Sequence, residues 1–573
     1  MELIRVTWGK GMNSDVLPYE LPDGYCSNAV NARFRNGFAE RVGGSLDASI
    51  SYISSVATPP DWMELYPSAL SATGRFLVYA GTTTVFADNI SATKTDITRY
   101  TQGASISSIT RVGTTATLTT SSNHGRINGD TVSVWGAVPS QYNGTYVIGG
   151  VTATTFTYTM ASDPGASAAP VGLYSYNGVT SLFPGTSGSW SGGSLNGVLI
   201  VNHATSGLYY WNGDITTHLR KFPVSNVSDT ARVFKNYIVQ LASTVNGTKQ
   251  NHNVAWSAAA APGTIPASFT ATATNDAGNV DLAETSGSVI DCMPWGDLNI
   301  VFKEDGRFGM QYIGGNDKFR FYRLPGTEGL LNKGCIANTP KGQVFLTANL
   351  DVMIHTGGVA TSIAQGRVRN LLATIPAANK NNAFLCVNPY ANEVWVFYPA
   401  PGDTYPKQAL IWNWDDDTWG QKADAFGMRC ATSGLLTSSL SGQYMVLGRN
   451  SLSIGFVDLS STDFGLTFIS TIERQGLTFG DSDSIKFLSR SRWQMDGQPS
   501  YSLTVYHGSA MTADASPVYA AATAYTPGTT NFCNARATGG SFLAVKAELP
   551  TTTANKPTLV RSCELEFAKG GRR

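Results

Sequence analysis

Charged residues are scarce in this sequence. Asp, Glu, Lys and Arg make up 14% of its 573 residues, whereas they make up about 25% of a typical soluble domain. Glycine and aromatic residues are abundant: the sequence has 59 glycines, and 11% of its residues are aromatic. This composition favours strands and turns over long solvated helices. Forty basic residues balance forty acidic ones, so no overall field attracts nucleic acid or an anionic membrane. We therefore predict a mainly β protein whose net charge indicates no partner.

Long apolar segments are also missing. No run of 18 or more apolar residues occurs, and the first fifteen residues, MELIRVTWGKGMNSD, lack the apolar core of a signal peptide. We expect no membrane-spanning segment and no export by a standard signal.

Cysteine is rare, and its seven positions form no C-x-x-C pair. An odd number of widely spread cysteines is not typical of a disulfide scaffold or of a thiolate zinc site. We expect reduced thiols, as in a protein that folds in a cytoplasm, at Cys26, Cys292, Cys335, Cys386, Cys430, Cys533 and Cys563.

The common catalytic motifs are absent. No two of the six histidines are closer than fifteen residues, which excludes H-E-x-x-H and other local zinc motifs. The G-x-S-x-G nucleophile elbow and the G-x-x-x-x-G-K-[ST] phosphate loop do not occur either. We predict no catalytic, cofactor-binding or metal-ligating residues, no cofactor and no enzymatic activity. The histidines are expected on the surface or in loops, at His124, His203, His218, His252, His355 and His507.

Three consecutive aspartates, Asp415-Asp416-Asp417, stand in the stretch IWNWDDDTWG. Consecutive side chains point in different directions, and no glutamate follows at the spacing of a calcium loop. Asp shares with Asn the ability to hydrogen-bond its own backbone in a turn. We interpret the triplet as a hairpin turn rather than a metal or catalytic cluster.

A second acidic group leaves an alternative open. Propeller glycosidases place Asp and Glu around a central channel, to protonate the leaving group and to stabilise an oxocarbenium ion. A sialidase also needs a basic cluster for the substrate carboxylate, and no sequence pattern specifies one. The alternative hypothesis is thus a propeller carbohydrate-binding or glycan-hydrolysing, sialidase-like protein acting in host-receptor recognition. Its candidate carboxylates are Asp291, Asp297, Glu304, Asp305 and Glu328.

Repeated strand-turn patterns dominate the chain. Seven units of two strands and their turns open near Gly74, Asn196, Asn236, Gly296, Gly342, Asn392 and Gly442. The last five spacings, of 40, 60, 46, 50 and 50 residues, are typical of a four-stranded blade, and they predict a β-propeller of six to eight blades. Three stretches are predicted to form related blade-tip turns, SYNGVTSL from Ser175, YWNGDITTH from Tyr210 and NWDDDTWG from Asn413.

Four further features complete the predicted organisation. Asn36-Gly37 separates AVNARFR from FAERV and predicts a hairpin with a type I′ turn. Five Thr-, Val- and Tyr-rich runs separated by turns predict an inserted small β-barrel or sandwich. The spacing of apolar residues within 361–380 predicts one helix. Longer strands near the C-terminus predict a C-terminal β-sandwich platform. The expected domains are an N-terminal arm and hairpin (1–50), a first blade (51–103), the insertion (104–172), the remaining blades (173–463) and the platform (464–573).

Basic side chains gather in one short stretch of the platform, KFLSRSRW. Strand alternation places Lys486, Arg490 and Arg492 on one face. Three cations are a small footprint for nucleic acid, so we interpret them as a solvated face or a subunit contact.

Three stretches carry a resemblance to a known family. They are GMNSDVLPYELPDGYCSNAVNARFRNGFAERVGG near the N-terminus, IWNWDDDTWG, and the closing FAKGGRR. Together they resemble the tail nozzle, or tail hub, proteins of short-tailed bacteriophages, also called packaged-DNA stabilisation proteins. The inserted runs GDTVSVWGA, YNGTYVI and TTFTYT are similar to small β modules of bacteriophage virion proteins.

The resemblance implies a virion structural protein that forms a homohexameric distal tail tube. Such a tube closes the DNA exit channel and then conducts the genome, so double-stranded DNA would pass through it without specific contacts. The implied partners are the tail adaptor or portal-side connector protein and the tail fibres or spikes. The implied location is the virion tail, after assembly in the cytoplasm of the host bacterium.

Overall fold

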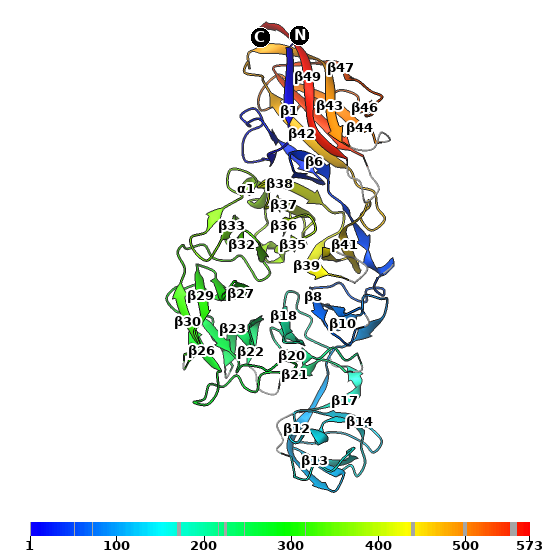
Figure 1. The fold of residues 1–573 in the computed structure, drawn as a ribbon, viewed down its shortest axis with the longest axis vertical. Helices are drawn as coiled ribbons and strands as arrows, with labels where there is room; N and C mark the ends of the chain where they lie inside the picture. The colour runs from blue at the N-terminus through cyan, green and yellow to red at the C-terminus, as the bar shows by residue number, and fades with distance from the viewer. Residues whose placement is uncertain are drawn as a thin grey trace. The chain divides into compact units, whose positions relative to one another are not determined.

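The computed structural model describes residues 2–50, 52–71, 73–168, 173–180, 182–215, 217–222, 226–245, 247–315, 317–436, 442–496, 501–550 and 558–572. Strands make up most of the regular structure (Figure 1). The chain divides into two compact units: a first unit of Met1–Leu65, Asn89–Thr93 and Ala283–Arg573, and a second unit of Tyr66–Asp88 and Lys94–Leu282. No helix in the described residues is both long and apolar enough to cross a membrane.

Seven blades of four antiparallel strands recur in the described residues, and the fold is a β-propeller. The first three blades are β8 (Trp62–Pro67), β9 (Arg75–Ala80), β10 (Val85–Asp88), β11 (Lys94–Asp96); β18 (Trp190–Leu195), β19 (Val198–His203), β20 (Gly207–Trp211), β21 (Arg220–Lys221); and β22 (Val227–Phe234), β23 (Tyr237–Val245), β25 (Asn253–Trp256), β26 (Gly278–Asp281). The next two are β27 (Val289–Trp295), β28 (Leu298–Lys303), β29 (Arg307–Tyr312), β30 (Phe319–Arg323); and β31 (Ile336–Thr339), β32 (Gly342–Leu346), β33 (Val352–His355), β34 (Thr361–Ser362). The last two are β35 (Phe384–Asn388), β36 (Glu393–Tyr398), β37 (Gln408–Asn413), β38 (Thr418–Ala423); and β39 (Met428–Leu435), β40 (Gln443–Arg449), β41 (Ser453–Ser460), β7 (Gly44–Asp47).

The second strand of each blade begins at, or within two residues of, a predicted unit opening. Several of these openings need a left-handed backbone, as at Gly74 (φ 79°), Asn196 (φ 49°) and Asn392 (φ 58°). Gly and Asn adopt that region more readily than most residues. The seven predicted units are therefore confirmed as the seven blades.

The seventh blade takes its fourth strand from the N-terminal segment. β7 pairs antiparallel with β41, with Phe456 opposite Leu46 and Val457 opposite Ser45. Residues 44–47 thus complete a blade whose other three strands lie about 400 residues later in the chain. No local sequence pattern predicts this pairing.

The insertion is one six-stranded sheet in the order β15-β14-β17-β12-β13-β16. Its strands are β12 (Tyr100–Val112), β13 (Thr115–Thr120), β14 (Thr131–Val134), β15 (Gly144–Val147), β16 (Thr155–Thr159) and β17 (Leu173–Thr180). Its own core includes Leu118, Val132, Tyr142 and Phe156. The predicted β module is thus present. Within residues 100–168 and 173–180, no strand pairing joins β15 to β16, and an isolated bridge between Gly149 and Thr157 links the two ends of the sheet.

The prediction of a blade-tip turn at SYNGVTSL is wrong, although its residue 181 lies outside the described residues. Residues 175–180 belong to strand β17, which pairs with both β12 and β14. Asn177-Gly178 lies where the β12–β17 register shifts, so this pair occupies an irregularity of a long strand instead of closing a hairpin.

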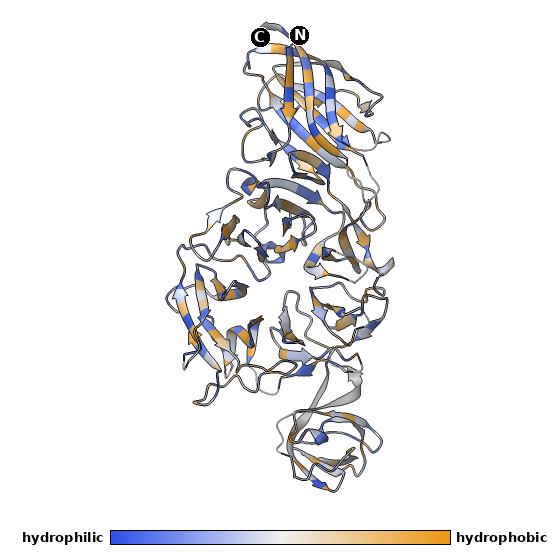
Figure 2. Cartoon of the chain, in the orientation of Figure 1, coloured by the Kyte–Doolittle hydropathy of each residue, from blue (hydrophilic) through white to orange (hydrophobic). Residues whose placement is uncertain are grey.

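The C-terminal strands form two sheets that enclose a core (Figure 1). One contains β43 (Ser484–Asp496), β47 (Cys533–Gly540) and β49 (Leu559–Arg572), and the other contains β42 (Ser470–Leu477), β44 (Leu503–Ala510), β45 (Val518–Tyr519), β46 (Thr523–Tyr525) and β48 (Phe542–Leu549). Hydrophilic and hydrophobic residues alternate along many of these strands (Figure 2), as the two faces of a sandwich sheet require.

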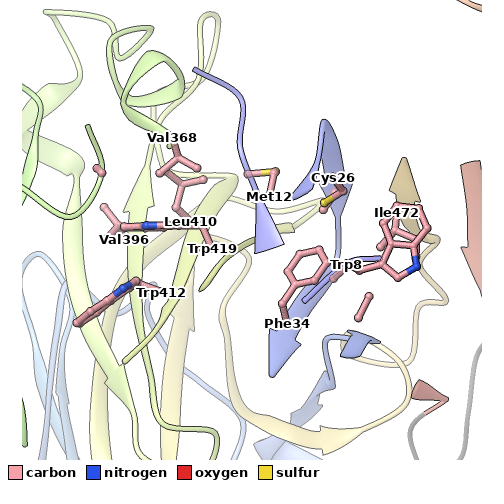
Figure 3. Packing of buried hydrophobic residues seen from close by; sticks show 14 of the residues in the cluster. Trp8, Met12, Cys26, Phe34, Val368, Val396, Leu410, Trp412, Trp419 and Ile472 are labelled. Atoms are coloured by element: carbon pink, nitrogen blue, oxygen red, sulfur yellow. The ribbon is translucent and has the colours of Figure 1, made fainter. Parts of the chain in front are cut away.

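The N-terminal arm supplies strands to this sandwich. β1 (Glu2–Thr7) pairs with β49, and β4 (Asn28–Val30) pairs with β42. The Trp8 ring stacks on Trp493 with ring centres 6.2 Å apart. Trp8, Phe34 and Ile472 belong to the same buried cluster as Trp412 and Trp419 of the sixth blade (Figure 3).

The predicted helix is wrong in extent. Within 361–380 the structure contains β34, one helical turn α1 (Arg369–Leu372), and the first residue of a 3₁₀ turn at Lys380–Asn382. Thr361-Ser362 pair with β33, and Gly366 has φ 72°, so the segment is an extended strand and a turn before α1 begins. Val368, Leu372 and Ile375 are nevertheless buried, which explains the apolar spacing.

Candidate functional site

The best-defined cluster of polar residues surrounds a hairpin that joins the sixth blade to the sandwich. Strands β5 (Ala32–Arg35) and β6 (Phe38–Arg41) pair with each other around Asn36 (φ 52°) and Gly37 (φ 78°), so the predicted type I′ hairpin is confirmed. β5 also pairs with β38 of the blade, and β6 pairs with β49 of the sandwich. We call β5 and β6, with their two neighbours, the hairpin joint.

The aspartate triplet forms the turn between β37 and β38, at the edge of this joint. The side-chain oxygen of Asn413 accepts hydrogen bonds from the backbone N–H groups of Asp415 and Asp416, at 3.0 and 3.1 Å. Asp417 has φ 52°, a conformation that Asp tolerates. The turn interpretation is confirmed, and Asn413 is part of the turn.

The carboxylates of this turn bind different parts of the first unit. Asp416 Oδ2 accepts a hydrogen bond from the backbone N–H of Asn36 at 2.6 Å. Asp417 Oδ1 accepts one from Trp412 Nε1 at 2.9 Å, and the Asp417 carbonyl accepts one from Arg367 Nη2 at 2.6 Å. The Asp416 carboxylate thus connects the turn to the N-terminal hairpin, and the Asp417 backbone carbonyl connects it to Arg367.

A buried charge cluster occupies the hairpin joint. Arg33 in β5 is 3% exposed and contacts three carboxylates, each from a different strand. Its Nη2 pairs with Asp458 of β41, its Nη1 lies 3.4 Å from Glu393 of β36, and its Nε lies 3.8 Å from Glu40 of β6. A single guanidinium therefore ties together the N-terminal hairpin and two blades.

The cluster contains more acid than base. Burial raises the pKa of Glu393 to about 7 against the opposing effect of Arg33, and burial also raises the pKa of Glu40. Burial acts on Asp458 in the same direction, but pairing with Arg33 and the hydrogen bond from Asn388 outweigh it and lower its pKa. Burial therefore favours the protonated forms of Glu393 and Glu40, whereas its pairing with Arg33 favours the charged form of Asp458.

A second buried ion pair fixes the start of the C-terminal region. Lys422 Nζ in β38 pairs with Asp463, whose other oxygen accepts a hydrogen bond from the Ser45 backbone N–H at 2.9 Å. Arg41 donates to the Ser461 carbonyl at 2.8 Å. The hairpin joint is therefore held by buried charges on both of its sides.

Asp297 does not converge with two of the other candidate glycosidase carboxylates. Asp297 lies in the turn before β28, whereas Glu304 and Asp305 lie just after it. These positions are separated by the length of the strand, about 20 Å at 3.3 Å per residue. Glycosidases of either stereochemical class need carboxyl groups within about 10 Å.

The remaining candidates have structural partners. Asp291 is 1% exposed and its Oδ2 accepts a hydrogen bond from the Gly334 N–H at 3.1 Å. Glu328 lies 3.6 Å from the Arg307 guanidinium. Asp305 accepts hydrogen bonds from the Gly287 N–H at 2.7 Å and the Thr285 hydroxyl at 2.8 Å; these bonds lower its pKa although burial opposes them.

The basic stretch of β43 is split between two faces, so the prediction of one shared face is wrong. Lys486 is buried and donates to the carbonyl groups of Ser541 and Ser484, at 2.9 and 3.1 Å. Arg490 pairs with Glu566 at 2.5 Å, and Arg492 is exposed. The strand register shifts between Leu488 and Arg490, and a one-residue shift reverses the facing of every later side chain.

Three histidines lie buried in strands, contrary to the prediction of surface or loop positions, whereas His124 is buried in a loop. The three in strands, at 2% exposure or less, are His203, His355 and His507. Burial lowers the pKa of His355 and of His507 to about 4. Within the described ranges, no group of three or more His, Cys, Asp or Glu side chains has metal-binding geometry. All seven cysteines are buried and free.

Comparisons with known proteins concern the fold. No protein-family model matches the sequence, and no curated protein matches it. The chain is similar to the Neurospora crassa Pan2 WD40 domain, at 10% identity over 70% of this chain and 89% of that chain, with a TM-score of 0.26. It is similar to the β-propeller domain of Myceliophteria thermophila Cps50 (Swd1), at 8% identity over 63% and 99%, with a TM-score of 0.31. It is also similar to the phage phi92 endosialidase, at 11% identity over 71% and 65%, with a TM-score of 0.21.

Proposed function

We propose that this chain is a structural protein of a bacteriophage virion that forms the distal tail tube, or nozzle, as a homohexamer. The observation that carries the proposal is the hairpin joint. The arm quoted for the family resemblance contains β4, which pairs with β42 of the sandwich, and the β5–β6 hairpin, which pairs with both the sixth blade and the sandwich. The segments that resemble the nozzle proteins are therefore the ones that connect the parts of the fold.

The charge pattern supports a conduit for DNA. Each phosphate that a protein neutralises adds counterion-release affinity, so a wall along which a genome slides must not bind phosphates tightly. A chain with 14% charged residues and no net charge suits such a wall. The cations of β43 add little to a DNA footprint, because Lys486 is buried and Arg490 is paired with Glu566.

In this proposal the protein acts as a gate and has no catalytic role. Loops of the hexamer narrow the channel until adsorption, and their rearrangement then releases the genome. The tail adaptor or portal-side connector binds at one end, and tail fibres or spikes dock on outward faces of the propeller or of the insertion. The glycosidase alternative is weaker, since the candidate carboxylates have structural partners and Asp297 lies a strand length from Asp305.

Two experiments test this proposal. An antibody against the insertion, imaged on virions, is expected to label the tail end distal to the capsid; labelling of the capsid or of free fibres would contradict it. A hydrolase assay of the purified protein on host surface glycans is expected to show no turnover above background. Turnover abolished by Asp305→Asn would favour the sialidase-like alternative instead.

A further inference from the structure

A cavity of about 310 Å³ lies in the second unit, between the second blade and a loop of the third. Polar side chains from the end of β20 to β21 line it, namely Asn212, Thr217, His218 and Arg220. Tyr210 and Trp211 add aromatic walls, and Gly263 to Ile265 form its other side. Small-molecule sites start at about 300 Å³ and combine apolar walls with a few convergent polar groups, so this cavity suits a ligand of one or two sugar rings.

Among the described residues that line the cavity, Arg220 is the only lysine or arginine. Its guanidinium lies 5.7 Å from the centre of the Trp135 ring, and Arg220 lies opposite Tyr210 in the β20–β21 strand pair. Among the described residues it forms no ion pair, unlike Arg33 or Arg449. The Trp135 ring helps to hold the guanidinium in place and leaves its charge uncompensated.

The neighbouring groups offer both donors and acceptors. The Asn212 side-chain oxygen accepts a hydrogen bond from the Asp214 N–H at 3.3 Å, which orients its amide N–H₂ group. The Thr217 hydroxyl donates to the Asp214 carbonyl at 2.8 Å and can still accept. Burial raises the pKa of Tyr210, so its hydroxyl stays protonated and can donate. A ligand with several hydroxyl groups would satisfy this set.

From this arrangement we infer that the cavity binds a carboxylated sugar residue, with the carboxylate on Arg220 and the sugar hydroxyls on Asn212, Thr217 and Tyr210. A guanidinium pairs with a carboxylate through two parallel hydrogen bonds. One unpaired cation matches the single negative charge of a carboxylate, whereas a phosphate monoester would carry between about 1.5 and 2 negative charges. The inference does not depend on the proposed hexamer, and no bond is made or broken in it.

The test is a titration of the full-length protein with D-glucuronate and N-acetylneuraminate, followed by ligand-observed NMR. We expect dissociation constants of about 1 mM or tighter for at least one acid, and no measurable binding of D-glucose. Arg220→Gln is expected to weaken binding about tenfold or more, because a charge-assisted pair is lost. The matched control is Arg320→Gln, at an exposed position of β30, and this variant is expected to bind like the wild type.

A second variant keeps the test valid if Arg220→Gln fails to fold. Thr264 is exposed at the cavity, on the loop opposite β21, and Thr264→Phe should fill the cavity and abolish binding without touching the blade strands. Acetate or inorganic phosphate competing as well as the sugar acids would overturn the sugar assignment. Equal binding of D-glucose, or binding unchanged in Arg220→Gln and Thr264→Phe, would overturn the site; neither result bears on the oligomeric state.

Discussion

The backbone N–H of Asn36 donates a hydrogen bond to the Asp416 carboxylate at 2.6 Å, across 380 residues of sequence. Each residue lies in a turn, one at the tip of the β5–β6 hairpin and the other between β37 and β38. The acidic triplet thus connects the N-terminal hairpin to the sixth blade. In the proposed nozzle, this contact belongs to the joint that holds propeller and sandwich together.

Removing the Asp416 carboxylate should weaken this joint. We expect Asp416→Ala to lower the free energy of unfolding by about 1 kcal/mol, the contribution of a typical hydrogen bond, and Asp416→Asn to lower it by less, because an acceptor remains. Urea unfolding can be followed by tryptophan fluorescence, since Trp8, Trp412, Trp419 and Trp493 lie in the first unit. A stability of Asp416→Ala equal to that of the wild type would refute the connecting role.

Removing the Arg33 guanidinium should lower the free energy of unfolding by far more than removing the Asp416 carboxylate. Arg33→Met leaves Glu40, Glu393 and Asp458 buried without their shared cation, and breaking a buried ion pair on one side costs about 3–5 kcal/mol. The matched control is Arg35→Met, because Arg35 also contacts Glu40, at 2.8 Å, but is 33% exposed. Its loss should cost about 1 kcal/mol or less. Equal effects of the two variants would show that the cluster does not hold the joint.

Glu393 should make stability depend on pH. Its pKa rises from 4.5, the ordinary value of a glutamate, to about 7 in the fold, so between those values the folded state binds a proton that the unfolded state does not. Stability from this residue is present in full below pH 4.5 and is lost as pH rises towards 7, by up to about 3 kcal/mol. The buried His355 and His507, with pKa values lowered from 6.5 to about 4, act in the opposite direction and lose stability as pH falls below 6.5.

The comparison that isolates Glu393 is therefore wild type against Glu393→Gln. Glutamine keeps an oxygen that can accept the hydrogen bond from Trp395 Nε1, 2.9 Å from Glu393 Oε2. The stability difference between the two proteins, measured by urea unfolding at pH 5, 6 and 7, should shift in favour of the variant as pH rises. A difference independent of pH would show that Glu393 does not bind a proton in this range.

The seven thiols should resist modification in the folded protein. All are buried, and burial raises the pKa of Cys386 to about 12, so little reactive thiolate is present at neutral pH. Treatment with N-ethylmaleimide at pH 7 should add no adduct to the native chain and seven adducts after denaturation, as counted by intact mass. Rapid labelling of any native cysteine would contradict the buried positions.

Features set by short stretches of sequence were predictable. Four of the seven second strands follow a Gly or Asn with φ > 0, at Gly74, Asn196, Gly296 and Asn392. The Asn36-Gly37 hairpin and the aspartate turn likewise depend on Gly, Asn and Asp at such positions or on a side chain that binds its own backbone. Features set by distant pairing were not. The placement of β7 beside β41 and the contact of Arg33 with Glu393 depend on partners hundreds of residues away. The bulge that turns Arg490 away from the face of Lys486 depends on a single shift of register. The short α1 shows the same limit, since burial of Val368 and Leu372 arises from the tertiary fold and not from a long helix.

A homohexameric tail tube can be recognised by cryo-electron microscopy of the purified full-length protein, with its mass in solution measured in parallel. We expect six-fold rings with an axial channel, alone or after addition of the tail adaptor protein. A protein that stays monomeric at micromolar concentration with and without the adaptor, and that hydrolyses bacterial glycans, would contradict it.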